Sequence, residues 1–186
     1  MRSRDCGRLR GLSCTARFGT GVIITMAKYR LNTRLFVARP LDETFAFFAD
    51  AANLQKLTPP WLSFRIRTPQ PIVMRPGAII DYLIIVRGLP VPWRTRISDW
   101  TPPARFVDEQ LWGPYWRWHH THTFAAVDGG TLVEDTVLYS PIGGALMHGL
   151  MVKRDLQRIF TFRQHQILKQ FQVEARGPIA VQIDRL

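Results

Sequence analysis

Residues 116–140 read WRWHHTHTFAAVDGGTLVEDTVLYS, two alternating stretches on either side of an Asp-Gly-Gly turn. Glycine admits the positive φ that a tight hairpin turn requires, so Asp128-Gly129-Gly130 predicts a β-hairpin. Its two strands are expected over 116–127 and 131–140. The stretch therefore predicts an antiparallel unit within a larger sheet.

One face of the first predicted strand carries aromatic and imidazole side chains, because alternate residues of a strand point to the same side. The residues on this face are Trp116, Trp118, His120, His122 and Phe124. An apolar surface with a few hydrogen-bonding groups is typical of the wall of a small-molecule cavity. We therefore expect the two Trp and two His residues to contact a ligand.

The second predicted strand places Asp135 and Tyr139 on one face. If Asp135 faces the cavity, its carboxylate needs a partner or a shifted pKa. Arg163 is the candidate partner, because it interrupts the apolar stripe of a helix expected later in the chain. The alternative is that Arg163 extends to the rim of the cavity and Asp135 is solvated. The expected ligand-binding residues are Trp93, Trp116, Trp118, His120, His122, Asp135, Tyr139 and Arg163.

The three histidines between positions 119 and 122 raise the question of a metal site, because imidazole is a common metal ligand. His120 and His122 share a face, but His119 points the other way. No cysteine or carboxylate within the same strand completes a tetrahedral set. The sequence therefore predicts no metal site and no cofactor.

Other segments continue the alternation of the hairpin or show helical spacing. Further strands are expected over 29–39, 62–68, 78–87, 93–100 and 105–111, short helices over 41–50 and 52–57, and a long helix after Gly144 that ends near Phe171. Residues 174–186 are expected to form a loose tail. This order predicts an α+β fold, in which a curved antiparallel sheet of about seven strands surrounds a long C-terminal helix.

The composition of the 186-residue chain, 46% hydrophobic and 11% aromatic, predicts one soluble globular domain with a sizeable core. No apolar run approaches the roughly 18 residues that span a bilayer. The net charge is +11, but the basic residues are dispersed along the chain. The sequence therefore predicts no nucleic-acid partner, and it leaves weak association with an anionic membrane surface open.

Residues 1–25 contain five arginines and one acidic residue, a composition that targeting peptides share. They lack a long apolar segment, and Met26 directly precedes the first alternating stretch. We expect a disordered extension from an upstream start site, with a transit peptide as the alternative, followed by a domain over 26–173. Cys6 and Cys14 both lie in this extension, so a disulfide framework is not expected and the cytoplasm is the expected compartment.

Five stretches together resemble the helix-grip superfamily, which includes START lipid-binding domains and birch-pollen-allergen-like proteins. They cover residues 40–48, 88–97, 106–115, 118–124 and 159–163, and they are most similar to small bacterial SRPBCC proteins of the polyketide cyclase/dehydrase-like branch. The resemblance extends over about residues 29–171. It implies a ligand cavity between the curved sheet and the C-terminal helix, but no particular activity.

The function expected from these observations is the binding of a small hydrophobic molecule without turnover. One alternative is a polyketide cyclase/dehydratase-like lyase that uses His120, His122 or Asp135 for acid-base chemistry. Another is a membrane-peripheral lipid or quinone carrier, indicated by the basic charge and by the apolar segments 145–147 and 150–152.

Overall fold

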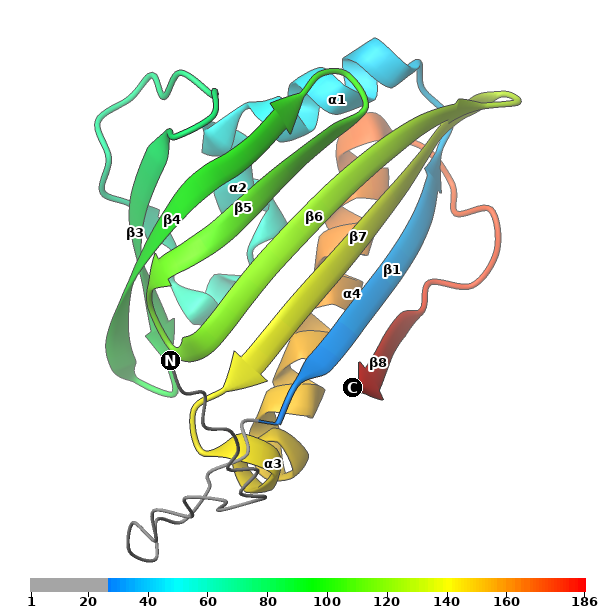
Figure 1. The fold of residues 1–186 in the computed structure, drawn as a ribbon. Helices are drawn as coiled ribbons and strands as arrows, with labels where there is room; N and C mark the ends of the chain where they lie inside the picture. The colour runs from blue at the N-terminus through cyan, green and yellow to red at the C-terminus, as the bar shows by residue number, and fades with distance from the viewer. Residues whose placement is uncertain (1–26) are drawn as a thin grey trace, which may run out of the picture.

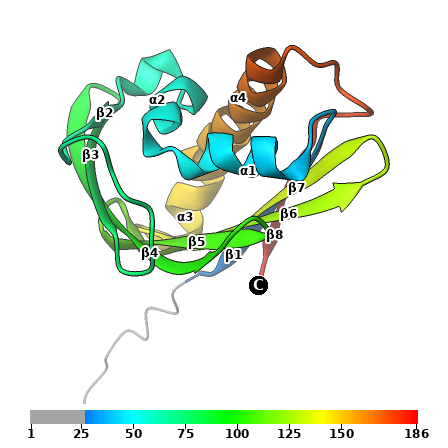
Figure 2. The same cartoon turned by 90° about the horizontal axis from the view of Figure 1, so that it is seen from above.

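A computed structural model describes residues 27–186, so the expected N-terminal extension over 1–25 lies outside the described residues. Its strands form one curved antiparallel sheet in the order β2-β3-β4-β5-β6-β7-β1-β8. A long helix crosses the concave side of this sheet (Figures 1 and 2). The strands are β1 (Tyr29–Val37), β2 (Arg65–Ile66), β3 (Ile79–Val86), β4 (Leu89–Thr101), β5 (Arg105–Trp112), β6 (Tyr115–Val127), β7 (Gly130–Pro141) and β8 (Val181–Arg185).

The helices lie on the concave side of the sheet (Figure 2). They are α1 (Leu41–Ala49), α2 (Leu54–Leu57), α3 (Gly144–Met147) and α4 (Lys153–Phe171), with 3₁₀ turns at Ala51–Asn53 and Pro60–Leu62 and a π-helical turn at His148–Val152. Helix α4 buries Leu156, Phe160 and Ile167 at the spacing of one helical face. These positions confirm the predicted α+β plan of a curved sheet around a long C-terminal helix.

Two tight hairpins set the register of the central strands. The turn between β3 and β4 uses Arg87 and Gly88, both with positive φ, as a two-residue hairpin requires. The predicted Asp-Gly-Gly turn joins β6 to β7, where Val127 pairs with Gly130. Because side chains alternate from face to face, this register decides which residues of neighbouring strands meet inside the fold.

The expectation of a loose C-terminal tail is wrong for its last residues. Strand β8 pairs with β1 at the edge of the sheet, with Ile183 opposite Leu31, and this raises the number of strands to eight. Val181 and Ile183 alternate with polar residues, and β1 offers an unpaired edge, so main-chain hydrogen bonds hold the segment. Gln164 of α4 also donates to the carbonyl of Ala180 at 3.4 Å.

Two predicted strands differ from the structure by more than two residues at one end. The strand expected over 62–68 is reduced to the two residues of β2, because a 3₁₀ turn runs to Leu62 and Ser63 has a left-handed backbone conformation. The strand expected to begin at Trp93 begins instead at Leu89, directly after the tight turn. Prolines at positions 90 and 92 are tolerated in β4 despite the hydrogen-bond donors they lack.

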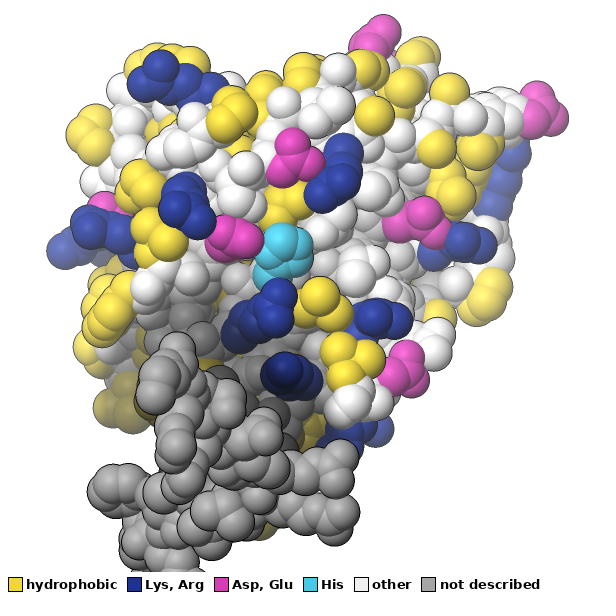
Figure 3. All heavy atoms as spheres, in the orientation of Figure 1, with side chains coloured by type: hydrophobic (Ala, Val, Ile, Leu, Met, Phe, Trp, Pro, Cys, Tyr) yellow, Lys and Arg dark blue, Asp and Glu magenta, His cyan; other side chains and the backbone are white. Residues whose placement is uncertain are grey.

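The outer face of the sheet carries basic and acidic side chains, several of them close to one another (Figure 3). Arg94 pairs with Asp81, Arg96 with Glu109, and Arg34 with Glu134, each across neighbouring strands. His119 also lies on this face and contacts Glu109 at 2.9 Å. Over the part of the chain that the structure describes, none of the helices is both long and apolar enough to cross a membrane.

Candidate functional site

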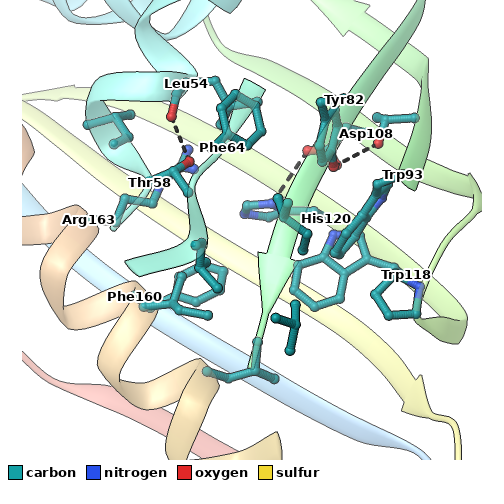
Figure 4. Close-up of a pocket in the computed structure, with 18 of the residues that line it drawn as sticks. Leu54, Thr58, Phe64, Tyr82, Trp93, Asp108, Trp118, His120, Phe160 and Arg163 are labelled. Atoms are coloured by element: carbon teal, nitrogen blue, oxygen red, sulfur yellow. Dashed lines mark hydrogen bonds and ion pairs between the residues drawn. The ribbon is translucent and has the colours of Figure 1, made fainter. Parts of the chain in front are cut away.

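A cavity of about 560 Å³ lies between the concave side of the sheet and the helices. Its volume falls in the range of small-molecule sites, roughly 300–1,000 Å³. Aromatic side chains from the sheet, from α4 and from the segment after α2 form much of the wall (Figure 4). They include Phe64, Tyr82, Trp93, Tyr115, Trp118 and Phe160.

The rings of this wall pack against one another. Trp93 meets Trp118 edge to face, with ring centroids 5.3 Å apart, and stacks on Tyr82 at 5.6 Å. The Tyr82 hydroxyl lies within hydrogen-bond distance, 3.2 Å, of Thr95 Oγ1. Such contacts hold large apolar surfaces in fixed positions, so the aromatic part of the wall is held by its own packing.

A polar cluster made of Asp108, His120, His122 and Asp135 interrupts the aromatic wall. The register of β5, β6 and β7 brings these residues together, because Asp108 pairs with His120 and Asp135 pairs with His122. His122 Nε2 lies 3.0 Å from Asp108 Oδ2, and His120 Nε2 lies 3.1 Å from Asp135 Oδ1. The imidazole centroids are 3.8 Å apart.

The remaining ring nitrogens face the opposite carboxylates. His122 Nδ1 lies 2.7 Å from Asp135 Oδ1, a contact that is close but not aligned as a hydrogen bond. His120 Nδ1 lies 3.4 Å from Asp108 Oδ2. Each imidazole is therefore placed between the same two carboxylates.

Two further groups contact the buried carboxylate of Asp135. Thr33 Oγ1 donates to Asp135 Oδ2 at 3.2 Å, and Arg163 Nε lies 3.9 Å from the same oxygen. The Nε group of Arg163 is buried and has no hydrogen-bond acceptor among the described residues. The predicted proximity of Arg163 and Asp135 is therefore confirmed, although the pair makes no direct hydrogen bond.

The residues of the polar cluster shift one another's pKa values in different directions. Burial opposes ionisation of Asp135, but His122, Arg163 and the imidazole hydrogen bonds outweigh it and hold the pKa of Asp135 well below its usual range. Burial also disfavours a charged His122, yet Asp135 and Asp108 raise its pKa. Burial and the neighbouring charge of His122 lower the pKa of His120.

These shifts favour one charge distribution of the cluster over the others. They favour the ionised forms of both carboxylates, the protonated form of His122 and the neutral form of His120. A neutral imidazole whose Nε2–H donates to Asp135 keeps a lone pair on Nδ1. His120 can therefore accept a hydrogen bond or a proton beside the cavity.

The structure divides the predicted ligand-binding residues into groups. Trp93, Trp118, His120, His122 and Arg163 line the cavity. Asp135 and Tyr139 are buried behind that lining, where Asp135 contacts the histidines and the Tyr139 hydroxyl lies 2.9 Å from His148 Nε2. Their part in ligand binding stays a prediction.

Trp116 does not lie on the cavity wall, so its predicted position is wrong. Its side chain is 65% exposed, whereas Trp118 on the same strand is 9% exposed. A β-bulge causes the difference: Tyr115 pairs with Pro141 and Arg117 with Ser140, which leaves Trp116 as the extra residue. Tyr115 takes the inward position instead, and Gln110 Nε2 donates to its carbonyl at 2.6 Å.

The sequence left the position of one residue of the site open and did not indicate several others. Asp108 lines the cavity and shares its strand with Phe106 and Gln110, a mixed row that fits an inner or an outer face equally well. Only the pairing of Asp108 opposite His120 shows that Asp108 lies on the inner face. Phe64, Tyr82, Tyr115 and Phe160 were also missed as cavity residues.

Comparisons with known proteins agree with this architecture. The family model described as polyketide cyclase/dehydrase and lipid transport matches residues 37–165. Protein Ms6760 from Mycobacterium smegmatis has a TM-score of 0.59 and 17% identity, over 77% of this chain and 90% of that chain. TTHA0849 from Thermus thermophilus has a TM-score of 0.54 and 19% identity, with 76% and 98% covered. Ara h 8.0201 has a TM-score of 0.52 and 16% identity, with 76% and 99% covered.

At these identities the structural likeness shows a shared fold, and it confirms the expected helix-grip architecture. A comparison with curated proteins gave no match.

Proposed function

The chain belongs to the polyketide cyclase/dehydrase and lipid transport family, and from this premise we propose that it binds a small hydrophobic molecule that carries a polar group. The aromatic wall supplies apolar contact area for the body of the molecule. The single observation that carries the proposal is the Asp/His cluster set into this wall, because it can orient a polar end by hydrogen bonds.

Trp118→Ala is expected to weaken the binding of an apolar naphthalene dye by about 1–3 kcal/mol, because a large buried aromatic surface is lost. The measurement is a titration of dye fluorescence in the full chain. Trp116→Ala is the matched control, since it removes the same side chain from the same strand outside the cavity. Equal affinities of the two folded variants would contradict ligand binding at this wall.

The enzymatic alternative uses the same cavity, and the neutral His120 beside Asp108 favours it. A general base needs a free lone pair within reach of the substrate, and His120 Nδ1 offers one. A cyclase/dehydratase-like reaction would then transfer a proton between His120 and the bound molecule. Turnover that depends on pH and is lost in His120→Gln would separate this alternative from simple binding.

A carrier that docks on anionic membranes is a second candidate, favoured by apolar side chains at one end of the cavity. Ile142, Leu146 and Leu150 are exposed there, and Lys153 and Arg154 follow at the start of α4. The lining of the cavity reaches this end through Ile142 and Met151. Apolar groups beside cations are the features that bind anionic lipid surfaces.

The double variant Leu146→Glu and Leu150→Glu is expected to reduce binding to phosphatidylserine-containing vesicles by about tenfold or more. It removes two apolar contacts and adds negative charge facing the lipid. Co-sedimentation with vesicles measures the effect, and Val127→Glu at the distant β6-β7 turn serves as the control. Equal losses in both variants would exclude the α3 end as the docking surface.

A further inference from the structure

Both imidazoles of the polar cluster lie between the same two carboxylates. Each ring turns one nitrogen toward Asp108: His122 Nε2 at 3.0 Å and His120 Nδ1 at 3.4 Å from the same oxygen. Each turns its other nitrogen toward Asp135 Oδ1, at 2.7 Å and 3.1 Å. Each side of the cluster therefore holds one nitrogen of each ring and the oxygen of one carboxylate.

The side of Asp108 is open to the cavity, and the side of Asp135 is closed. Asp108, His120 and His122 all line the cavity, and the Asp108 side chain keeps 18% of its surface exposed. Asp135 is only 3% exposed, and its second oxygen already contacts Thr33 and Arg163. A ligand that approaches from the cavity thus meets the nitrogens beside Asp108.

We propose that Asp108, His120 and His122 bind a divalent transition-metal ion of the Zn²⁺ type on the cavity wall. One ligand atom from each residue lies within 4.8 Å of the others. Bonds of about 2.0–2.1 Å around a tetrahedral ion separate its ligand atoms by roughly 3.3 Å, close to the spacing of Asp108 from the two nitrogens. Two imidazoles and one carboxylate are a common donor set for such ions.

Asp135 fits the part of an outer carboxylate in this site. A histidine that binds a metal usually donates its other ring N–H to a carboxylate, which fixes the orientation of the ring. Asp135 faces the second nitrogen of both histidines. His122 Nδ1 is buried without an aligned hydrogen bond among the described residues, so a small rotation of this ring would improve its contact with Asp135.

The charges also suit a cation. Asp108 and Asp135 place two carboxylates in a largely buried cluster, where Arg163 is the guanidinium beside them. Because His122 must give up its proton to bind the ion, the ion takes the place of that proton as a counter-charge to the carboxylates. Three protein ligands leave a fourth position that faces the cavity, where water or an oxygen atom of a bound molecule can coordinate. The inference goes beyond the proposed ligand binding and does not depend on it.

The test is titration of the untagged full chain with Co²⁺ and Zn²⁺ after treatment with EDTA and its removal. Cys6→Ser and Cys14→Ser form the background, so that no thiol contributes. We expect one equivalent to bind, with the visible absorption of Co²⁺ in a low-symmetry site. Asp108→Asn and His120→Gln should each weaken binding at least about 100-fold, and Asp135→Asn about 10- to 100-fold.

His119→Gln is the matched control and should leave the affinity unchanged, because His119 lies on the same strand but contacts Glu109 on the outer face. Absence of stoichiometric binding, or equal losses in the His119 and His120 variants, would overturn the proposal. If the site variants do not fold, X-ray absorption of the Zn²⁺-loaded chain decides: two imidazoles with oxygen donors support the site, and any other donor set overturns it.

A separate readout distinguishes this inference from the proposed function. Dye binding is measured in the EDTA-treated protein. Absence of dye binding there would contradict the hydrophobic cavity, but it would not change the result of the metal titration. Metal binding in a protein that takes up no dye would support the ion site alone.

Discussion

Asp135→Asn is expected to lower the free energy of unfolding by about 3–5 kcal/mol, the range for removing one partner of a buried ionic cluster. The substitution keeps the size of the side chain but removes the negative charge that faces His120, His122 and Arg163. The remaining cations then lie in a buried place with Asp108 as their main counter-charge. Urea unfolding in the presence of EDTA measures the effect without any metal contribution.

Glu134→Gln is the control for Asp135→Asn, because it makes the same chemical change at the neighbouring position on the outer face. Its carboxylate pairs with Arg34 at 2.7 Å, but the Arg34 side chain is 72% exposed. Such exposed pairs contribute about 0–1 kcal/mol. Losses of similar size in the two variants would contradict a special role for the buried cluster.

Arg163→Met combined with Asp135→Asn tests how strongly these two residues are coupled. Removal of either charge alone leaves the other buried with fewer partners, so the double variant should lose less than the sum of the single losses. Strictly additive effects would show that the histidines, and not Arg163, compensate Asp135.

The sequence predicted the sheet, the long helix and much of the inner face, because alternation and helical spacing report which side of an element is buried. The parity of Trp118, His120, His122 and Phe124 agrees with the structure, since all four are buried. The alternation predicted the wrong face for Trp116, because the bulge adds one residue to the strand there. A bulge changes the face of every residue on one side of it, and alternation alone does not reveal its position.

The composition of the polar cluster was harder to predict for a different reason. Strand β6 itself contains histidines but no carboxylate. The carboxylates come from the flanking strands: Asp108 from β5 and Asp135 from β7. Their positions depend on the pairing register, which is set by turns and long-range contacts rather than by any local pattern.

Strand β8 in the C-terminal segment was also not predicted, because its position depends on pairing with another strand. Residues 181–185 alternate only briefly, and a short edge strand gains stability from the strand beside it rather than from its own sequence. Its partner is β1, about 150 positions earlier in the chain. Local reasoning could therefore find the alternation but not the pairing.

Acidification below about pH 4 is expected to destabilise the wild-type chain more steeply than Asp135→Asn. Burial alone would raise the pKa of Asp135, but His122 and Arg163 hold it well below the usual value near 3.8. The carboxylate of Asp135 is therefore protonated at a higher pH in the unfolded chain than in the folded chain. The stabilisation is complete above the unfolded pKa and is lost as the pH falls toward the folded pKa.

The two histidines affect stability near neutral pH in opposite directions. The raised pKa of His122 adds stability below pH 6.5, which is lost as the pH rises through the folded value. The lowered pKa of His120 adds stability above pH 6.5, which is lost as the pH falls. Their contributions to stability therefore partly cancel. The free energy of unfolding of the wild type should change most steeply with pH in the acid range.

Urea unfolding from pH 3 to 9 in EDTA, on the wild type, Asp135→Asn and Glu134→Gln, tests this profile. Each unit by which the folded pKa of Asp135 lies below its unfolded value corresponds to about 1.4 kcal/mol, so the difference between wild type and Asp135→Asn should shrink on acidification. Glu134→Gln should follow the wild type throughout, because its ion pair is solvated. Wild-type and Asp135→Asn curves that stay parallel below pH 4 would mean that Asp135 is not held ionised by the histidines and Arg163, and the charge distribution assigned to the cluster would then be wrong.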